Sequence, residues 1–366
     1  MRRRPRPALL GVLAAISLLV PATASAQTKS APEPKIVGGS QVSISQYPWQ
    51  AAVVFTGSGN AHTRQFCGGE LITSQIVLTA GHCVFDTDPD CGPNSNFARP
   101  AFCTTLFDPG GDGTAKIDPN DVDVVLGRTT LSNTLEGAEV GVMATAFQSN
   151  YDGDFQGDGV PRFDVGYLVL NAASAQPQIH IADSTQGPLW DADSPVDISG
   201  WGTTKKCTIN CGSTSDTLMA ATTHIIADAT CSSDYGSDFD STTMVCAGEP
   251  SGGVDTCGGD SGGPLQASLG GGAYVLVGLT GWGDGCAQAG TPGVYTRVAG
   301  PTMRPLIESD VAALEQQFNL PPESPNGATT RRTKSVANRL AKCKRIRNKT
   351  KRKRCVKKAK RKQKTA

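Results

Sequence analysis

Three short segments carry residues that could act together in nucleophilic catalysis. They are Thr-Ala-Gly-His-Cys with His82, Asp-Val-Gly-Tyr-Leu with Asp164, and Gly-Gly-Asp-Ser-Gly-Gly-Pro with Ser261. A serine hydroxyl is a weak nucleophile near neutral pH, so Ser261 needs a base, and imidazole titrates in that range. A carboxylate that accepts the proton on the second ring nitrogen would fix the tautomer of His82. We therefore predict that Ser261 is the nucleophile, His82 its base and Asp164 the residue that orients His82.

The glycines before Ser261 suit a turn in which the backbone itself does chemistry. A Gly-rich turn lets the amides of Gly259 and Ser261 point together at the oxyanion of a tetrahedral intermediate. Each such donor is worth about 2.7–4 kcal/mol. A single serine turn or a single histidine is usually structural, but the three motifs in one chain favour the catalytic interpretation.

On these motifs the chain, from Ile36 to about Phe318, resembles the trypsin-like serine proteases of the chymotrypsin fold. The resemblance implies an all-β fold of two antiparallel six-stranded β-barrels. It implies that His82 and Asp164 lie on the first barrel and Ser261 on the second, with the cleft between them. The expected activity is that of a serine endopeptidase, which works through an acyl-enzyme intermediate without a cofactor.

The same resemblance assigns an activation site to the start of this region. The sequence Ile-Val-Gly-Gly begins at Ile36, directly after Lys35. Cleavage after Lys35 would create a new amino group on Ile36, which is expected to insert beside Asp260 and order the oxyanion hole. The alternative is that Lys35 is only an exposed basic residue.

The resemblance also assigns a substrate pocket. Asp255 occupies the family position for the carboxylate at the base of the primary pocket, and Gly283 and Gly293 match the wall positions that glycine leaves open. Trp282 is expected to line the same site. This pattern implies cleavage after Arg or Lys. Gly281 stands where the family usually has a serine that contacts the triad carboxylate.

The 12 cysteines are an even number, and an exported chain would form disulfides from them. The family bridges correspond to Cys67 with Cys83, Cys231 with Cys246, and Cys257 with Cys286. Proximity alone suggests Cys91 with Cys103 and Cys207 with Cys211, which leaves Cys343 and Cys355. A zinc site is less favoured, because the sequence has no Cys-x-x-Cys pair and only four histidines.

The charge is divided unevenly along the chain. Residues 36–320 carry a net charge of −22 and residues 321–366 a net charge of +18.

Residues 1–26 have a basic start, an apolar run and a small-residue end, which predicts a secretory signal peptide. We therefore expect a signal peptide (1–26), an activation propeptide (27–35), a protease domain (36–320) and a Pro-containing linker with a basic tail (321–366).

Short β-branched runs between turns predict the strands that must position these residues. The expected strands are 51–55, 76–79, 122–126, 167–170 and 274–280, and apolar residues at helical spacing predict one helix over 301–318. An insertion is expected around 86–119. The acidic stretch 152–159 could bind Ca²⁺, although a plain acidic loop is favoured because Phe163 takes the closing-ligand position of an EF-hand loop.

Two other function classes remain open at this point. One is a catalytically dead binding protein on the protease fold. The other is a catalytically weak protein of this fold that acts mainly through its basic tail, by binding a polyanion or a cell surface. The expected partners are protein or peptide substrates with Arg or Lys, and an anionic cell-wall polymer or other polyanion at the tail. The tail lacks interleaved aromatic residues, which argues against sequence-specific nucleic-acid binding.

Overall fold

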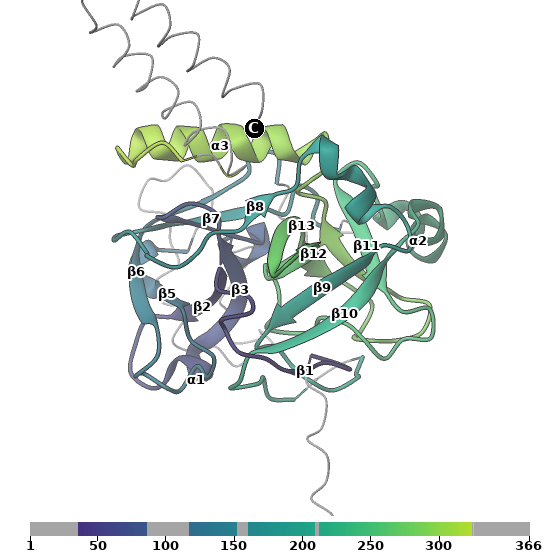
Figure 1. Ribbon diagram of the computed structural model, residues 1–366, viewed down its shortest axis with the longest axis horizontal. Coiled ribbons are helices and arrows are strands. Elements are labelled where there is room, and N and C mark those ends of the chain that lie inside the picture. Colours follow the sequence, from purple (N-terminus) through teal and green to yellow (C-terminus); the bar gives the residue numbers. More distant parts are fainter. Residues whose placement is uncertain (1–35, 86–116, 152–159, 209–211, 324, 326–366) are drawn as a thin grey trace, which may run out of the picture. The chain divides into compact units, whose positions relative to one another are not determined.

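The computed structural model describes residues 36–85, 117–151, 160–208, 212–323 and 325 (Figure 1). The predicted signal peptide and propeptide, including Lys35, lie outside the described residues. So do most of the predicted insertion, the acidic stretch 152–159, and the chain beyond Pro325. Among the helices that the structure describes, none is both long and apolar enough to cross a membrane.

Six antiparallel strands form the first barrel. In spatial order they are β2 (Gln50–Phe55), β3 (Gln65–Leu71), β4 (Ile76–Thr79), β7 (Gly166–Leu170), β6 (Ala138–Phe147) and β5 (Val122–Leu126), and β5 pairs with β2 to close the barrel. β4, β5 and β7 are largely the predicted apolar runs, and every residue of β4 and β7 is buried. A short helix, α1 (Ala61–Arg64), precedes β3.

Six further strands form the second barrel. In spatial order they are β10 (Met219–Ile226), β11 (Met244–Gly248), β14 (Gly293–Thr296), β13 (Ala273–Trp282), β12 (Pro264–Gly270) and β9 (Pro195–Gly200). β9 also pairs with β10, which closes this barrel. Two short strands extend it: β1 (Ser40–Gln41) pairs with β10, and β8 (His180–Ile181) runs parallel to β13. The predicted pair of six-stranded antiparallel barrels is therefore confirmed.

Helix α3 (Met303–Gln317) follows the last strand and confirms the predicted C-terminal helix (Figure 1). Its apolar stripe is buried, and the hydroxyl of Tyr167 on β7 donates a hydrogen bond of 2.8 Å to Asp310 on the helix. Pro305 fits in the first turn, where backbone N–H groups have no helical partner. The other helical segments are α2 (Asp228–Tyr235) and the 3₁₀ turns η1 (Gly81–Cys83), η2 (Pro119–Asp121), η3 (Ser184–Trp190) and η4 (Gly236–Asp238).

The first residues of the predicted linker lie against the body of the protein. The carboxylate of Glu323 accepts hydrogen bonds from the backbone N–H and hydroxyl of Ser74, at 3.0 and 2.7 Å, and from the Gln178 amide at 2.9 Å. The backbone N–H of Ile181 donates to the carbonyl of Pro325 at 3.0 Å. The chain is thus attached to the body as far as Pro325.

Candidate active site

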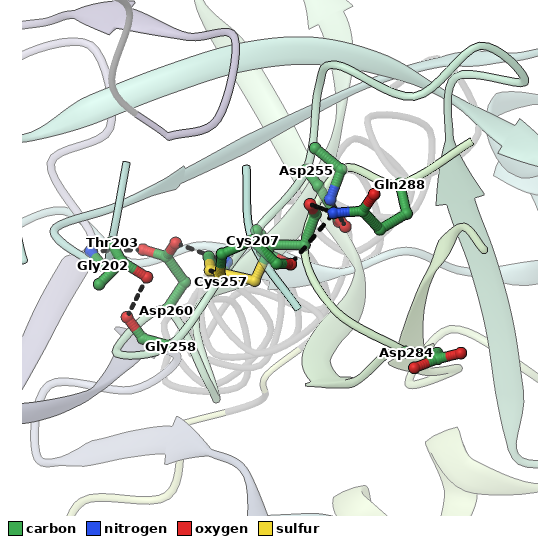
Figure 2. The surroundings of a disulfide bond; sticks show 12 residues. Gly202, Thr203, Cys207, Asp255, Cys257, Gly258, Asp260, Asp284 and Gln288 are labelled. Atoms are coloured by element: carbon green, nitrogen blue, oxygen red, sulfur yellow. Dashed lines mark hydrogen bonds between the residues drawn. A yellow bond between two sulfur atoms is a disulfide. The ribbon is translucent and has the colours of Figure 1, made fainter. Parts of the chain in front are cut away.

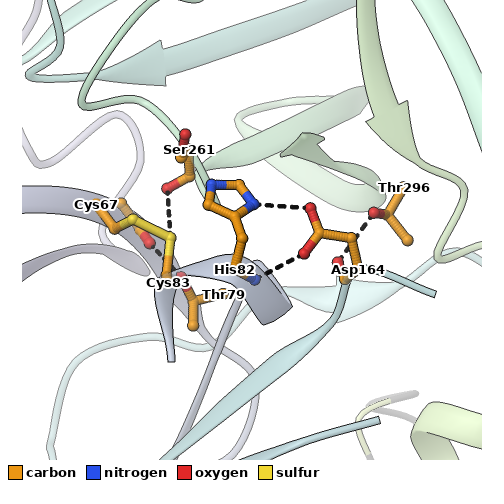
Figure 3. Close-up of polar contacts among 8 residues, drawn as sticks. Cys67, Thr79, His82, Cys83, Asp164, Ser261 and Thr296 are labelled. Carbon is orange, nitrogen blue, oxygen red and sulfur yellow. Dashed lines mark hydrogen bonds and ion pairs between the residues drawn. A yellow bond between two sulfur atoms is a disulfide. The ribbon is translucent and has the colours of Figure 1, made fainter. Parts of the chain in front are cut away.

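The pairing of β4 with β7 brings His82 and Asp164 together. His82 lies in η1, three residues after Thr79, and Asp164 lies two residues before Gly166, the cross-strand partner of Thr79. One oxygen of Asp164 accepts the backbone N–H of His82 at 2.8 Å, and the other contacts Nδ1 of the imidazole at 2.9 Å (Figure 3). Asp164 is only 2% exposed, so both of its hydrogen bonds to His82 are shielded from water. Together they hold the backbone and the imidazole of His82 in place.

The second barrel also holds Asp164. The hydroxyl of Thr296 on β14 donates a hydrogen bond of 2.9 Å to the Asp164 carbonyl. Gly281 lies on the same side, and a Cβ built there would be 3.8 Å from the Asp164 carboxylate and 3.0 Å from the Val294 carbonyl. A serine at position 281 would therefore be near enough to touch the carboxylate, whereas the glycine leaves the carboxylate oxygens to His82.

Ser261 approaches His82 from the second barrel. Figure 3 shows Ser261 beside the imidazole, on the side of the ring away from Asp164. The backbone N–H of Gly68 on β3 donates to the Ser261 carbonyl at 2.8 Å, so the first barrel helps to hold the turn. Gly262 has a φ of +76°, and a Cβ there would lie 2.2 Å from the Thr79 hydroxyl. Only glycine fits this point of contact between the barrels.

The turn before Ser261 presents two backbone amides. The backbone N–H of Thr203 donates to the Gly258 carbonyl at 2.8 Å. Since C=O and N–H of a trans peptide point in opposite directions, this bond turns the N–H of Gly259 the other way. Within the described chain, the amides of Gly259 and Ser261 donate no hydrogen bond to the protein. The positive φ of Gly259, +94°, suits a glycine at this position.

Asp260 points away from His82 into the protein. Its carboxylate is fully buried and accepts backbone N–H groups from Gly202 at 2.7 Å and Cys257 at 3.0 Å (Figure 2). Gly200 and Gly202 leave room for it, because a Cβ at either position would come within 2.4 Å of a carboxylate oxygen. Burial raises the pKa of Asp260 to about 7. Ile36 is also fully buried.

A cavity of about 240 Å³ adjoins Ser261 and is lined by Asp255, Trp282, Gly283 and Gly293 among others. Oδ2 of Asp255 accepts the backbone N–H of Ala287 at 2.9 Å, whereas Oδ1 is buried without a hydrogen-bond partner in the described chain. Burial raises the pKa of Asp255 to about 7. A Cβ at Gly293 would lie 2.6 Å from Oδ1, so glycine at this position leaves room for the oxygen.

Tyr235 is a residue of this region that sequence reasoning missed. Its ring meets the Trp282 ring edge-on at a centroid distance of 4.9 Å, and its hydroxyl donates to the Pro292 carbonyl at 2.6 Å. It thereby supports Trp282 beside the cavity. Tyr235 ends α2, a helix with weak amphipathic character, and no local pattern in the sequence singles it out.

The three disulfides predicted from the resemblance are present: Cys67–Cys83, Cys231–Cys246 and Cys257–Cys286. The first ties η1 to β3 beside His82, and the third braces the segments around Asp255. Sγ of Cys207 lies 4.0 Å from Sγ of Cys257 (Figure 2). Cys211, the predicted partner of Cys207, lies outside the described residues, as do Cys91, Cys103, Cys343 and Cys355.

Comparison with known proteins gives one consistent result. A family profile for trypsin matches residues 36–95 and 113–307. The chain is 34% identical to trypsin from Saccharopolyspora erythraea over 263 residues, which cover 72% of this chain and 93% of that protein. It is 34% identical to trypsin-1 from Astacus astacus over 267 residues, covering 72% and 95%. A trypsin-like protease from Streptomyces glaucescens is 27% identical over 285 residues, covering 78% and 86%.

Proposed function

Because this chain belongs to the trypsin family of serine proteases, we propose that it is a secreted endopeptidase, made as an inactive precursor, which cleaves after Arg and Lys. The observation that carries the proposal is the joint position of His82, Asp164 and Ser261. Residues from two barrels meet with the imidazole bonded to a buried carboxylate on one side and next to the serine on the other (Figure 3).

The proposed reaction follows from this arrangement. His82 takes the proton of Ser261 while the serine oxygen attacks the carbonyl carbon of the scissile bond. The Asp164 carboxylate, held at 2.9 Å from Nδ1, stabilises the imidazolium that forms. His82 then gives the proton to the leaving amine, which leaves an acyl-enzyme. Water, activated in the same way by His82, releases the acid and restores Ser261.

The amides of Gly259 and Ser261 would stabilise the tetrahedral intermediate. They are fixed before substrate arrives, since the Gly258 carbonyl accepts the Thr203 N–H, and the Asp260 carbonyl, which shares a peptide unit with the Ser261 N–H, accepts the Gly263 N–H. Donors fixed in advance need no reorganisation when negative charge develops on the substrate oxygen.

The cavity supports specificity for a basic side chain. Asp255 lines the cavity beside Ser261 with one buried carboxylate oxygen, Oδ1, that has no partner in the described chain, and the glycines at 283 and 293 add no side chain to the cavity wall. A guanidinium or ammonium group would supply both the charge and the hydrogen bonds that this carboxylate lacks. Trp282 would line the entrance.

Activation would begin with a cut after Lys35. The new ammonium group of Ile36 would pair with Asp260, whose carboxylate is buried without a cation in the described chain. The proposed organisation is a signal peptide (1–26), a propeptide (27–35), a protease domain (36–320) and a linker with a basic tail (321–366). Since Lys35 itself suits the proposed specificity, activation can be autocatalytic.

A covalent serine-directed inhibitor provides the test. We expect the form beginning at Ile36 to be titrated with one equivalent of inhibitor, and mass mapping to place the label on Ser261. The precursor with residues 27–35 should react far more slowly. A label on another residue would refute the assignment of the nucleophile, and equal labelling of both forms would refute the proposed activation.

A further inference from the structure

A buried carboxyl group lies behind the nucleophile turn and takes no part in the proposed chemistry. Glu70 on β3 is 0% exposed, and neither of its carboxyl oxygens has a hydrogen-bond partner in the described chain. Its cross-strand partner on β2 is Gln50, which is also 0% exposed and whose amide nitrogen likewise has no partner. Unsatisfied groups at such burial are rare and costly, so this pair needs an explanation.

The pair lies directly under the turn that carries Ser261. Gly68, two residues before Glu70 and therefore on the same face of β3, donates to the Ser261 carbonyl. A Cβ at Gly68 would lie 3.2 Å from the Cα of Gly263. A Cβ at Gly263 would in turn lie 3.6 Å from the Gln50 amide nitrogen. Gln50 thus lies beside Gly263, which is two residues from the nucleophile, and Glu70 is the cross-strand partner of Gln50.

A directional chain of hydrogen bonds ends at this pair. The Trp49 indole N–H donates to Gln266 at 2.8 Å, the Gln266 amide donates to Ser199 at 3.1 Å, and the Ser199 hydroxyl donates to the Gln50 carbonyl at 2.6 Å. Every link runs from donor to acceptor in the same direction. The Gln50 amide N–H is the next donor in the series, and the carboxyl oxygens of Glu70, the cross-strand neighbour of Gln50, are acceptors that have no other partner in the described chain.

Among the described residues, no cation is placed to balance a charge on Glu70. It is the one ionisable side chain in β2, β3, β4 and β12, apart from a cysteine held in a disulfide. The neighbouring acids are committed elsewhere: Asp260 accepts backbone N–H groups from Gly202 and Cys257, and Asp197 on β9 accepts the hydroxyls of Tyr47 and Tyr274. An ionised carboxylate here would be strongly unfavourable, and burial raises the pKa of Glu70 well above its usual range.

We propose that Glu70 is held as a neutral carboxylic acid which, with Gln50 and one internal water molecule, positions the turn that carries Ser261. A carboxylic acid offers one O–H donor and a carbonyl acceptor, and the Gln50 amide offers donors. No direct hydrogen bond joins these cross-strand neighbours. The proposed water would accept from the Gln50 amide and the Glu70 O–H and would donate to the Glu70 carbonyl. Glu70 is a positioning residue, and this role rests on the proposed function of Ser261.

The first arm of the test measures stability and needs no catalysis. In an inactive Ser261→Ala background, Glu70→Gln is compared with its glutamate parent by urea unfolding from about pH 5 to about pH 8. Because the folded state keeps the proton to higher pH than the unfolded state, the glutamate protein loses stability as the pH rises. The ratio of the folding equilibrium constant of the glutamine variant to that of its parent should therefore increase as the pH rises, by up to about tenfold per pH unit. Asp238→Asn, at an exposed residue of η4, is the control for the loss of one carboxylate.

The second arm measures catalysis in the active form. Glu70→Ala should lower kcat by about tenfold or more with little change in KM, and Glu70→Gln should restore most of it. If Glu70→Ala fails to fold, infrared difference spectra of the parent against Glu70→Gln replace it. They should show the carbonyl band of a protonated carboxylic acid at neutral pH.

Three results would overturn the inference. They are identical pH dependence of stability in parent and Glu70→Gln, a carboxylate band instead of an acid band, or an unchanged kcat in Glu70→Ala. A wild-type protein without peptidase activity would refute the proposed function, while the stability arm would still decide the protonation state of Glu70. The two failures are therefore distinguishable.

Discussion

Replacing Asp255 with serine should remove the preference for basic side chains and leave the reactive centre intact. Asp255 is 4% exposed, and the bond from Ala287 occupies only one of its oxygens. Burial raises its pKa from an ordinary 3.8 to about 7, which corresponds to roughly 4 kcal/mol of unfavourable free energy for the charged form without a bound cation. A substrate cation would recover much of this amount.

That magnitude sets the expected change in specificity. About 4 kcal/mol corresponds to roughly a thousandfold in kcat/KM between an Arg substrate and a matched apolar one. Asp255→Ser should reduce this ratio to within about tenfold of unity, because the pocket then holds neither charge nor bidentate acceptor. The assay compares kcat/KM on peptides that differ only at the residue before the scissile bond, together with the rate of Ser261 acylation by a small reagent.

The matched control is Asp284→Ser. Asp284 is an exposed acid on the loop beside the cavity, and Figure 2 shows it apart from Asp255. Its removal should alter the Arg preference by less than about threefold. The reasoning is refuted if Asp255→Ser keeps its Arg preference, or if the wild type cleaves mainly after Phe, Leu or Ala. Gly293→Val offers a second check, since a side chain there would meet Oδ1 of Asp255 and should abolish cleavage after Arg.

Three further predictions concern the precursor and the tail. In a Ser261→Ala precursor the raised pKa of Asp260 means that the free energy of unfolding should fall from about pH 4 to about pH 7, and Asp260→Asn should flatten the curve in urea titrations. A protein that begins at Ile36 should be active and one that retains residues 27–35 inactive, so equal rates on an Arg peptide would contradict the activation scheme. Residues 321–366 should bind heparin-like or other polyanions with an affinity that falls steeply with salt, and salt-independent binding would disprove an electrostatic tail.

Much of the fold was predictable because its signals are local. The predicted runs 76–79 and 122–126 coincide with β4 and β5. The predicted boundaries of the runs 51–55, 167–170 and 274–280 differ by no more than two residues from those of β2, β7 and β13. β-branched residues between turn residues suffice to specify such strands. Closure of the two barrels was expected from the resemblance, since no local pattern specifies which strands pair.

Other features depend on contacts between distant residues, which a single sequence does not reveal. The prolines at 321, 322 and 325 predict a linker, yet Glu323 finds its partner Ser74 across 249 positions of sequence. Glu70 resembles any polar residue in a strand until the packing of the barrel buries it completely. Tyr235 meets Trp282 only because α2 packs near β13.

Strand β1 has a consequence for how activation would proceed in time. Ser40 and Gln41 pair with Ala220 and Met219 on β10, so a newly cut end at Ile36 remains tethered four residues away, within about 14 Å. A tether this short gives the proposed ammonium group an effective concentration in the millimolar range or above at its own pocket. The ordering step after the cut should therefore follow first-order kinetics that do not depend on protein dilution. An added peptide that begins with Ile-Val should compete with the new end for the Asp260 pocket only when its concentration reaches this effective concentration.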